Sequence, residues 1–322
     1  MFDELVEKIK SGGEITFDEA LAMGELTGER LNELFLAALL VTRHLHGNRV
    51  DLCSIMNVKS GRCSEDCIFC AQSGHYRTDI DVYSLLSEEE ILEQALEMEA
   101  EGARRFSLVT SGKGILNSDF DKILAIFEIL REKTSLNLCA SLGIINYDQA
   151  VLLKKAGVTR YHHNIETSRS FYAKICTTHL FNERVETIRA AGKAGLEICA
   201  GGIIGLGESW RQRVEMAFKL KELHVTSVPV NILTPIKGTP LWGSHVPAPL
   251  EVLQTLAMFR MVLPGAVIRL AGGREAALRD LQSTALLAGV NGLMVGNYLT
   301  TSGRGIEHDL QMIKDLEIEI WE

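Results

Sequence analysis

From residue 49 onward the chain alternates short β-branched segments with longer segments of helical periodicity. Between the strand-like segments, apolar residues recur three and four positions apart, as in 91–102 and 120–130. Eight such strand–helix units over about 250 residues predict a parallel (β/α)8 TIM-type barrel. A doubly wound open sheet is the alternative. The predicted strands are 49–56, 104–109, 136–141, 158–165, 196–203, 226–233, 266–270 and 290–295.

The division of the chain follows from the same repeat. No proline- or serine-rich linker interrupts it, so residues 49–322 are predicted to form one barrel domain. Before the first strand, segments 16–26 and 29–45 carry spaced apolar residues typical of docked helices. We therefore expect residues 1–48 to be an N-terminal helical extension.

Composition narrows the possible partners and the compartment. The 322 residues carry a net charge of −9 without a basic block, which argues against nucleic acid as the partner. The longest apolar run, at 34–41, is far shorter than the roughly 18 to 20 residues of a membrane span. Because the first residues also lack the pattern of a secretory signal, we expect a cytoplasmic protein without membrane contact. Small molecules are the favoured partners.

Cysteine is the most informative residue type in this chain. Seven cysteines without an export signal argue against a disulfide framework. Three of them, Cys63, Cys67 and Cys70, form a CxxxCxxC motif in the loop after the first predicted strand. Thiolates are the usual ligands of iron–sulfur clusters, and three ligands leave one metal position open. A zinc site with His75 as fourth ligand, or three unrelated thiols, are the alternatives.

CxxxCxxC after the first strand of a βα barrel resembles the radical S-adenosylmethionine (SAM) superfamily. The resemblance implies that the three cysteines hold a 4Fe-4S cluster whose fourth iron binds the amino and carboxylate groups of SAM. It also implies that electron transfer cleaves SAM to methionine and a 5′-deoxyadenosyl radical. The cofactor would carry this chemistry while the protein orients it, so no side chain is expected to be catalytic.

Further motifs narrow the resemblance to the biotin synthase family. They are GRCSEDCIFCAQS, YHHNIETS, ICTTHLFNERVETI, EICAGGIIGLGES, VPVNILTPIKGTPL and VIRLAGGRE, and their order and spacing fit over residues 50–302. The family implies a sulfurtransferase that inserts sulfur into dethiobiotin to form biotin. It also implies an external electron donor of the flavodoxin or ferredoxin type, and a homodimer.

The resemblance assigns cofactor and substrate contacts residue by residue. Cofactor binding is expected at Phe69, Asn164, Glu166, Arg184 and Gly205. Glu166 stands where the family more often has Asp and would contact the ribose, and Arg184 would pair with the methionyl carboxylate. Substrate binding is expected at Asn164, Asn231, Thr300 and Thr301.

Two adjacent histidines, His162 and His163, lie among these motif residues. Neighbouring residues on a strand point to opposite faces, so at most one of the two is expected to face the barrel interior. Both are interpreted as satisfied polar residues near the site rather than as metal ligands.

A second, auxiliary iron–sulfur cluster is also implied, and here the chain departs from the better-known family pattern. Cys139, Cys199 and Arg269 match three of its ligands, but Ser107 stands where the second strand usually carries a cysteine. We hypothesise that Cys53 on the neighbouring first strand supplies the missing thiolate, which would leave the cluster as 2Fe-2S or make it larger.

Four alternatives bear on this hypothesis and on the function. Ser107 could itself be the ligand, or Cys53 could be a small buried apolar residue. A related radical enzyme acting on a different small substrate, or a non-catalytic iron–sulfur or zinc protein, are the other functions considered. Cys176 matches no cluster position and is interpreted as structural.

Overall fold

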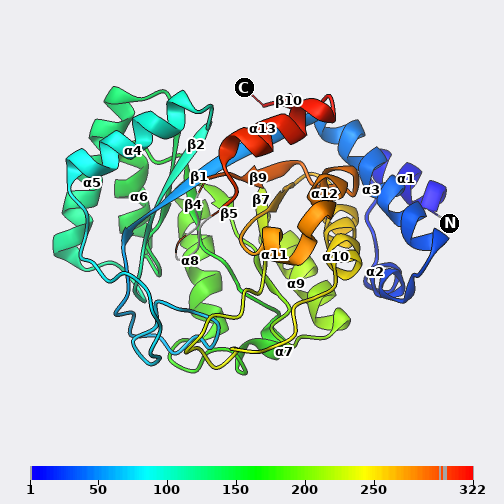
Figure 1. Ribbon diagram of the computed structural model, residues 1–322, viewed down its shortest axis with the longest axis horizontal. Coiled ribbons are helices and arrows are strands. Elements are labelled where there is room, and N and C mark those ends of the chain that lie inside the picture. Colours follow the sequence, from blue (N-terminus) through cyan, green and yellow to red (C-terminus); the bar gives the residue numbers. More distant parts are fainter. Residues whose placement is uncertain (1, 297–298, 300–302, 322) are drawn as a thin grey trace.

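A computed structural model describes residues 2–296, 299 and 303–321. Within this part of the chain, eight parallel strands close into a barrel, because the last of them pairs with the first at Asp51 and Gly292. This closure confirms the predicted (β/α)8 barrel and excludes the open sheet (Figure 1). The barrel strands are β1 (Arg49–Lys59), β2 (Arg105–Thr110), β3 (Asn137–Ser141), β4 (Arg160–His162), β5 (Glu197–Cys199), β7 (Ser227–Ile232), β8 (Val267–Leu270) and β9 (Gly292–Met294).

Two strand segments depart from the simple repeat. The predicted strand 196–203 divides into β5 and β6 (Gly202–Ile204), and both pair with β7. Gly201 lies at the division, where an added Cβ would be 1.9 Å from the carbonyl oxygen of Pro229. Only glycine allows this close approach of two backbones. β10 (Glu319–Ile320) lies outside the barrel and pairs with the beginning of β1.

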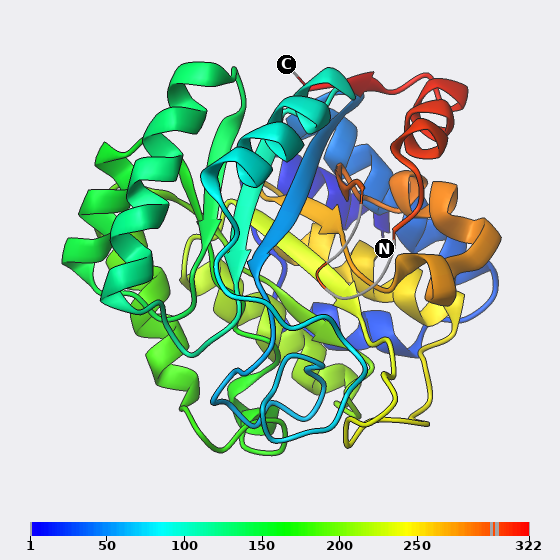
Figure 2. The same ribbon diagram turned by 60° about the vertical axis from the view of Figure 1, so that its left-hand side comes forward.

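Helices surround the barrel (Figure 2). Ser87, Asn146 and Ser209 each form a capping box that fixes where a helix begins. The helices after β1 are α4 (Glu88–Ala100), α5 (Asn117–Lys133), α6 (Tyr147–Lys155), α7 (Arg169–Tyr172), α8 (Phe181–Lys193), α9 (Trp210–Glu222), α10 (Pro249–Val262), α11 (Arg274–Leu278), η2 (Arg279–Leu281), α12 (Gln282–Leu287) and α13 (Ile306–Asp315).

The N-terminal helices pack on one side of the barrel. They are α1 (Phe2–Lys10), α2 (Phe17–Ala22), η1 (Met23–Glu25) and α3 (Glu29–His46). Helix α10 packs against α3 and is buried from Val252 to Val262, as a helix with neighbours on all sides must be. The Gln254 amide of α10 donates to the carbonyl oxygen of Met23 at 2.6 Å. Docked N-terminal helices are therefore confirmed, while the domain boundary at residue 48 stays a prediction.

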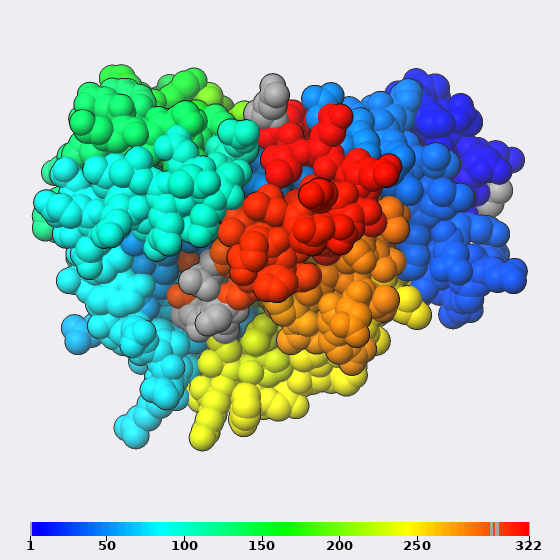
Figure 3. Space-filling model, turned by 45° about the horizontal axis from the view of Figure 1, so that its top comes forward, coloured from blue at the N-terminus to red at the C-terminus, as the bar shows by residue number. Residues whose placement is uncertain are grey.

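Helix α13 and β10 complete the molecule on another side. In Figure 3 the residues of α13 (red) lie between the surface of α4 and α5 (cyan to green) and that of α10 to α12 (yellow to orange). None of the helices in the described residues has the length and apolar character that crossing a membrane requires.

Candidate active site

The loop between β1 and α4 brings the three motif cysteines to one cavity. Cys63, Cys67 and Cys70 all line a cavity of 200 Å³. Backbone hydrogen bonds fix the loop: Cys63 N–H donates to Gln72 O at 3.0 Å, and Gly74 N–H donates to Cys63 O at 2.7 Å. The loop follows a barrel strand, where active sites of this fold lie. The conformation of the loop therefore brings three thiols to the wall of one cavity.

The chemistry of this donor set fits an iron–sulfur cluster with one open position. Three thiols border the cavity, and burial raises the pKa of Cys70 to about 11, so that a bound cation would favour the thiolate form of this side chain. His75 does not line the cavity; its ring bonds the carbonyl oxygen of Ser64 at 2.9 Å. This position speaks against a zinc site with His75 as fourth ligand.

Arg184 and Glu166 border the same cavity as the cysteine loop. Arg184, on α8, is buried, and its Nη1 lies 3.2 Å from Glu166 Oε1 and 2.9 Å from the carbonyl oxygen of Asn164. Glu166 has a φ of 66°, a left-handed conformation that costs energy in a residue with a side chain. Such strain is typical of residues that a site holds in place. The two residues expected to bind the cofactor thus form an ion pair at its predicted position.

The other residues expected to bind the cofactor are divided between two places. Phe69 and Asn164 both border the cysteine cavity, and the Asn164 side chain accepts from Gly201 N–H at 3.0 Å. Gly205 borders neither this cavity nor the barrel interior. It lies in a separate hollow with Glu208, and an added Cβ would be 2.6 Å from Pro247.

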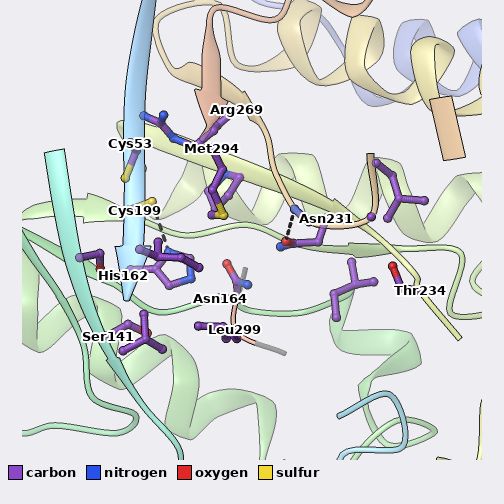
Figure 4. Close-up of a pocket in the computed structure, with 18 of the residues that line it drawn as sticks. Cys53, Ser141, His162, Asn164, Cys199, Asn231, Thr234, Arg269, Met294 and Leu299 are labelled. Atoms are coloured by element: carbon purple, nitrogen blue, oxygen red, sulfur yellow. Dashed lines mark hydrogen bonds between the residues drawn. The ribbon is translucent and has the colours of Figure 1, made fainter. Parts of the chain in front are cut away.

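A second cavity, of 260 Å³, occupies the barrel interior (Figure 4). Cys53, Cys139 and Cys199 line it from β1, β3 and β5, together with Arg269 and Ser107. Ser107 pairs with Ile55 in the β1–β2 register, so Cys53 lies two residues closer to the beginning of β1. The residues predicted to bind the auxiliary cluster therefore line the same cavity. Cys53 does not lie level with Ser107 but two residues nearer the beginning of the neighbouring strand.

Three arginines converge on one carboxylate beside these thiols. Arg269 Nη2 donates to Asp51 Oδ2 at 2.9 Å, and Arg105 and Arg160 lie 3.4 and 3.7 Å from the same oxygen. Burial opposes ionisation of Asp51, but the arginines, Arg269 foremost, hold the pKa of its carboxyl below the usual value. Glu197 balances part of the remaining charge by pairing with Arg160 at 2.8 Å. With two carboxylates and three guanidiniums, this group carries a formal surplus of one positive charge.

His162 and Cys199 form a hydrogen-bonded pair at the edge of the barrel cavity, with Nδ1 3.3 Å from Sγ (Figure 4). Burial opposes ionisation of the thiol, but His162, Arg160 and Arg269 lower the pKa of Cys199 to about 6. Burial raises the pKa of Cys139 to about 12. Of the two adjacent histidines, only His162 borders the barrel cavity, as predicted. His163 borders the cysteine cavity, and its Nε2 is buried without a hydrogen-bond partner among the described residues, so the interpretation of both as satisfied polar residues is wrong for His163.

The two cavities adjoin. Asn231 borders the barrel cavity, where its side chain is held by Gly272 N–H at 3.0 Å and by the carbonyl oxygen of Gly202 at 3.3 Å. Thr300 and Thr301, also predicted to bind substrate, lie outside the described residues. The residues common to the walls of both cavities are Phe69, Val109, Ser141, His162, Asn164 and Leu299.

Several residues of this region were missed or undervalued from the sequence. Asp51 supplies the anionic partner that a buried mid-strand arginine requires, and only the closure of the barrel brings it to Arg269. Cys176 lies beside Cys67 and His179; their ligand atoms are all within 4.8 Å of one another. No local pattern signals the contacts of Asp51 with Arg269 or of Cys67 with Cys176, because each joins segments far apart in the chain.

Comparison with known proteins identifies the class of the fold and site. Residues 57–220 match the family model "Radical SAM superfamily", and residues 229–319 match "Biotin and Thiamin Synthesis associated domain". The first match covers half of the chain and includes all three motif cysteines, so the chain belongs to the radical SAM superfamily.

Curated relatives narrow the family. A biotin synthase of Pelotomaculum thermopropionicum is 73% identical over 320 residues, which are 99% of this chain and 100% of that protein. One of Acetivibrio thermocellus is 53% identical over 97% of each chain, and one of Carboxydothermus hydrogenoformans is 50% identical over 99% of this chain and 100% of that protein. Within the superfamily, the chain belongs to the biotin synthase family.

Solved structures agree on the fold. Methylornithine synthase superposes with a TM-score of 0.87 at 21% identity, covering 99% of this chain and 97% of that one. The FeFe-hydrogenase maturase of Carboxydothermus hydrogenoformans superposes with a TM-score of 0.83 at 18% identity, covering 99% of this chain and 79% of that one. At these identities the likeness concerns the fold alone.

Proposed function

We propose that this protein is a biotin synthase, a sulfurtransferase that inserts sulfur into dethiobiotin with SAM as the source of the radical. The observation that carries the proposal is the pair of adjoining cavities, each lined by three thiols, in a chain of this family. A substrate held at their common wall would be in reach of both. An enzyme of the same superfamily with a different small substrate is not favoured, because the relatives with this name match over their full length.

Membership of the radical SAM superfamily implies a 4Fe-4S cluster and SAM, for which Cys63, Cys67 and Cys70 are the proposed protein ligands. When bound, the cluster supplies the electron that cleaves SAM, and an auxiliary iron–sulfur cluster supplies sulfur. Arg184 would pair with the methionyl carboxylate and Glu166 would accept from the ribose hydroxyls, while Phe69 would lie against the adenine. Each of these side chains borders the cysteine cavity. Gly205 lies further away and would act through its loop.

For the barrel cavity we propose that Cys53, Cys139 and Cys199 are the thiolate ligands of the auxiliary cluster. Cys53 and Ser107 both line the cavity, but iron–sulfur sites prefer thiolate. The surplus positive charge around Asp51 would stabilise an anionic occupant beside these thiols. Arg269 is proposed to be the nearest of these cations and a candidate ligand.

Asn164 and Asn231 are proposed to orient dethiobiotin at the common wall. Both side chains are held by backbone groups, so their positions are set before a ligand arrives. The hydroxyls of Thr300 and Thr301 would complete the site at the substrate carboxylate. An electron donor of the flavodoxin or ferredoxin type and a homodimeric assembly remain predictions from the family resemblance.

One anaerobic assay tests the proposal. Reconstituted protein is incubated with SAM, reductant and dethiobiotin, and 5′-deoxyadenosine and biotin are quantified by mass spectrometry. We expect both products. Deoxyadenosine without biotin would indicate another substrate, and the absence of both from fully loaded protein would contradict the proposed function.

A further inference from the structure

His179 connects the cysteine loop to the arginine proposed to bind SAM. The ring is buried, with Nδ1 2.5 Å from Glu65 Oε2 and Nε2 3.1 Å from Arg184 Nε. Glu65 lies between Cys63 and Cys67 in the motif, whereas Arg184 belongs to α8. A single imidazole therefore joins two segments of the cavity wall.

The hydrogen bonds define which ring nitrogen carries the proton. A carboxylate only accepts hydrogen bonds, so His179 Nδ1–H donates to Glu65. A guanidinium only donates, so the lone pair of His179 Nε2 accepts from Arg184. Glu65 is itself held by the Thr178 and Ser64 hydroxyls, at 2.8 and 2.9 Å. The imidazole is thus fixed from the loop side and presents an acceptor to the arginine.

Arg184 is oriented by acceptors at two of its three nitrogens. Besides His179, its Nε–H is shared with the Tyr172 hydroxyl at 2.7 Å. Nη1 donates to the carbonyl oxygen of Asn164 and faces Glu166. Within the described part of the chain, these contacts use Nε and Nη1, which leaves Nη2 for a ligand in the cavity. The direction of a hydrogen bond from Nη2 to a carboxylate depends on the plane of the guanidinium, and the acceptors at Nε help to set that plane.

The same imidazole is poorly placed to be a metal ligand. His179, Cys67 and Cys176 are close enough to form a three-ligand set, with Cys176 Sγ 3.2 Å from Nδ1. However, both ring nitrogens already have partners in Glu65 and Arg184. Binding of a metal at Nδ1 would move the proton to Nε2, where it would face the Arg184 N–H group.

We propose that His179 is a positioning residue for SAM binding: it relays the fixed position of Glu65 in the cysteine loop to the guanidinium of Arg184. This inference rests on the proposed function, in which Arg184 binds the methionyl carboxylate. The link holds the cluster ligands and the carboxylate-binding group in one rigid unit. SAM must contact the cluster and Arg184 at the same time, and the link holds these two parts of the site in the relative position that binding requires.

Two substitutions of His179 separate the relay from simple packing. The ring centroids of His179 and Tyr172 are 5.9 Å apart in an edge contact. His179→Phe keeps an aromatic ring at this position but removes both hydrogen bonds. Loss of a residue that orients a binding group costs about 10- to 100-fold in affinity, and we expect the dissociation constant for SAM to rise within that range. His179→Gln places an amide oxygen near the Nε2 position, where it can still accept from Arg184, but it loses the Nδ1–H bond to Glu65. We therefore expect a rise between those of the unsubstituted protein and His179→Phe, of less than about fivefold.

The matched control is His46→Gln. His46 also contacts a buried arginine, with Nε2 3.2 Å from Arg260 Nη1, but lies in α3, away from both cavities. We expect it to alter stability and to leave SAM affinity unchanged. Affinity is measured by titrating SAM into the dithionite-reduced protein and following the EPR spectrum. Iron and sulfide content, and the spectrum before SAM is added, show whether each variant holds its cluster.

The inference is supported if His179→Phe holds a normal cluster, binds SAM at least tenfold more weakly, and raises KM for SAM more than it lowers kcat for deoxyadenosine formation. It is overturned if the variant holds its cluster and binds SAM within twofold of the unsubstituted protein, or if Gln and Phe have equal effects. If the unsubstituted protein holds its cluster but does not bind SAM, the proposed function itself fails.

Discussion

The two sets of thiols in this protein are built in opposite ways. Cys63, Cys67 and Cys70 lie within eight consecutive residues of one loop, and hydrogen bonds inside that loop set their geometry. Cys53, Cys139 and Cys199 lie on three strands, and only the closed barrel brings them to one cavity. The loop set is thus specified mainly by its own segment, with added contacts to Ile175 and Thr178, whereas the strand set is specified entirely by topology.

The electrostatic surroundings differ in the same sense. At the loop set, the cavity wall carries Arg184 and Lys113 together with Glu166 and Glu65, so the formal charges of these side chains balance. At the strand set, three arginines share Asp51 and Glu197, which leaves a positive surplus in the barrel interior. A group bound by the strand thiols would lie in the positive potential of arginines whose positions the barrel fixes. A group bound at the loop would be held mainly by its cysteine ligands.

The largest effect is expected from removing a motif cysteine, and it is compared with the effect of changing a thiol beside it. Cys67→Ala removes one of three ligands, so we expect deoxyadenosine formation to fall to background and one cluster's iron to be lost. Cys176→Ser alters the thiol beside it, and we expect that variant to keep its iron and form deoxyadenosine. Iron analysis and mass spectrometry after anaerobic reconstitution check both. If both variants lost iron and deoxyadenosine formation equally, the distinction between a ligand and a neighbouring thiol would be wrong.

The strand set is tested by removing the Cys53 thiol and the Ser107 hydroxyl in two separate variants. Cys53→Ala is expected to abolish biotin formation and to lower iron content, while deoxyadenosine still forms, because the loop set is untouched. Ser107→Ala at the neighbouring strand is expected to keep the iron. Mössbauer and optical spectra of the reconstituted variants are the measurement. An unchanged spectrum in Cys53→Ala would show that Cys53 is an ordinary buried residue.

The charge group beneath the strand set is expected to contribute to folding. Asp51→Asn leaves three arginines with a single exposed carboxylate, so we expect the free energy of unfolding of the apoprotein to fall by about 3 kcal/mol. Asp119→Asn breaks the partly exposed pair with Lys59, at 2.7 Å, and should cost less than about 1 kcal/mol. Urea denaturation followed by circular dichroism measures both. A cost for Asp51→Asn no larger than for Asp119→Asn would mean that the barrel interior is well solvated.

The smallest effect concerns a buried histidine–arginine pair outside both thiol sets. Burial, with Arg260 beside it, lowers the pKa of His46 to about 4. The unfolded chain therefore binds this proton near pH 6.5 while the folded chain does not, and stability falls as the pH drops from about 6.5 toward 4. We expect the His46 contribution to be about 1 kcal/mol between pH 7 and 5, after allowance for partial exposure.

The difference between the pH profiles of the unsubstituted protein and His46→Gln isolates this contribution. Both are measured as urea unfolding of the apoprotein from pH 5 to 7.5. The substituted chain should have the flatter profile. Parallel profiles would assign the pH dependence to groups nearer the two cavities.

The sequence predicted those parts of the molecule that local patterns encode. All eight barrel strands were located, and the CxxxCxxC loop was placed after the first of them. Errors occur where a long-range contact intervenes. The predicted strand 158–165 ends at His162, before the backbone turns at Glu166, whose carbonyl oxygen accepts from Ile203 N–H at 2.8 Å.

The charged contacts inside the barrel could not be predicted from the sequence, because they too join residues far apart in the chain. Arg269 could be recognised as a buried cation in need of a partner, but Asp51 is 218 positions away in the chain. The Glu65–His179 contact joins residues 114 positions apart. Periodicity and motif spacing carry no information about such pairs, which depend on register between strands and on how the loops fold over the barrel ends.

The position of β1 has a consequence for how the molecule is made. This strand pairs with β2, but also with β9 and β10, and the Asn57 side chain donates to the carbonyl oxygen of Leu299 at 3.2 Å. During synthesis the first barrel strand leaves the ribosome early and lacks one of its neighbours until residues 292–294 follow. Such distant pairings form late and slowly. We therefore expect a nascent chain to expose its cysteine loop to solvent for most of translation, so that metal loading belongs to the completed polypeptide.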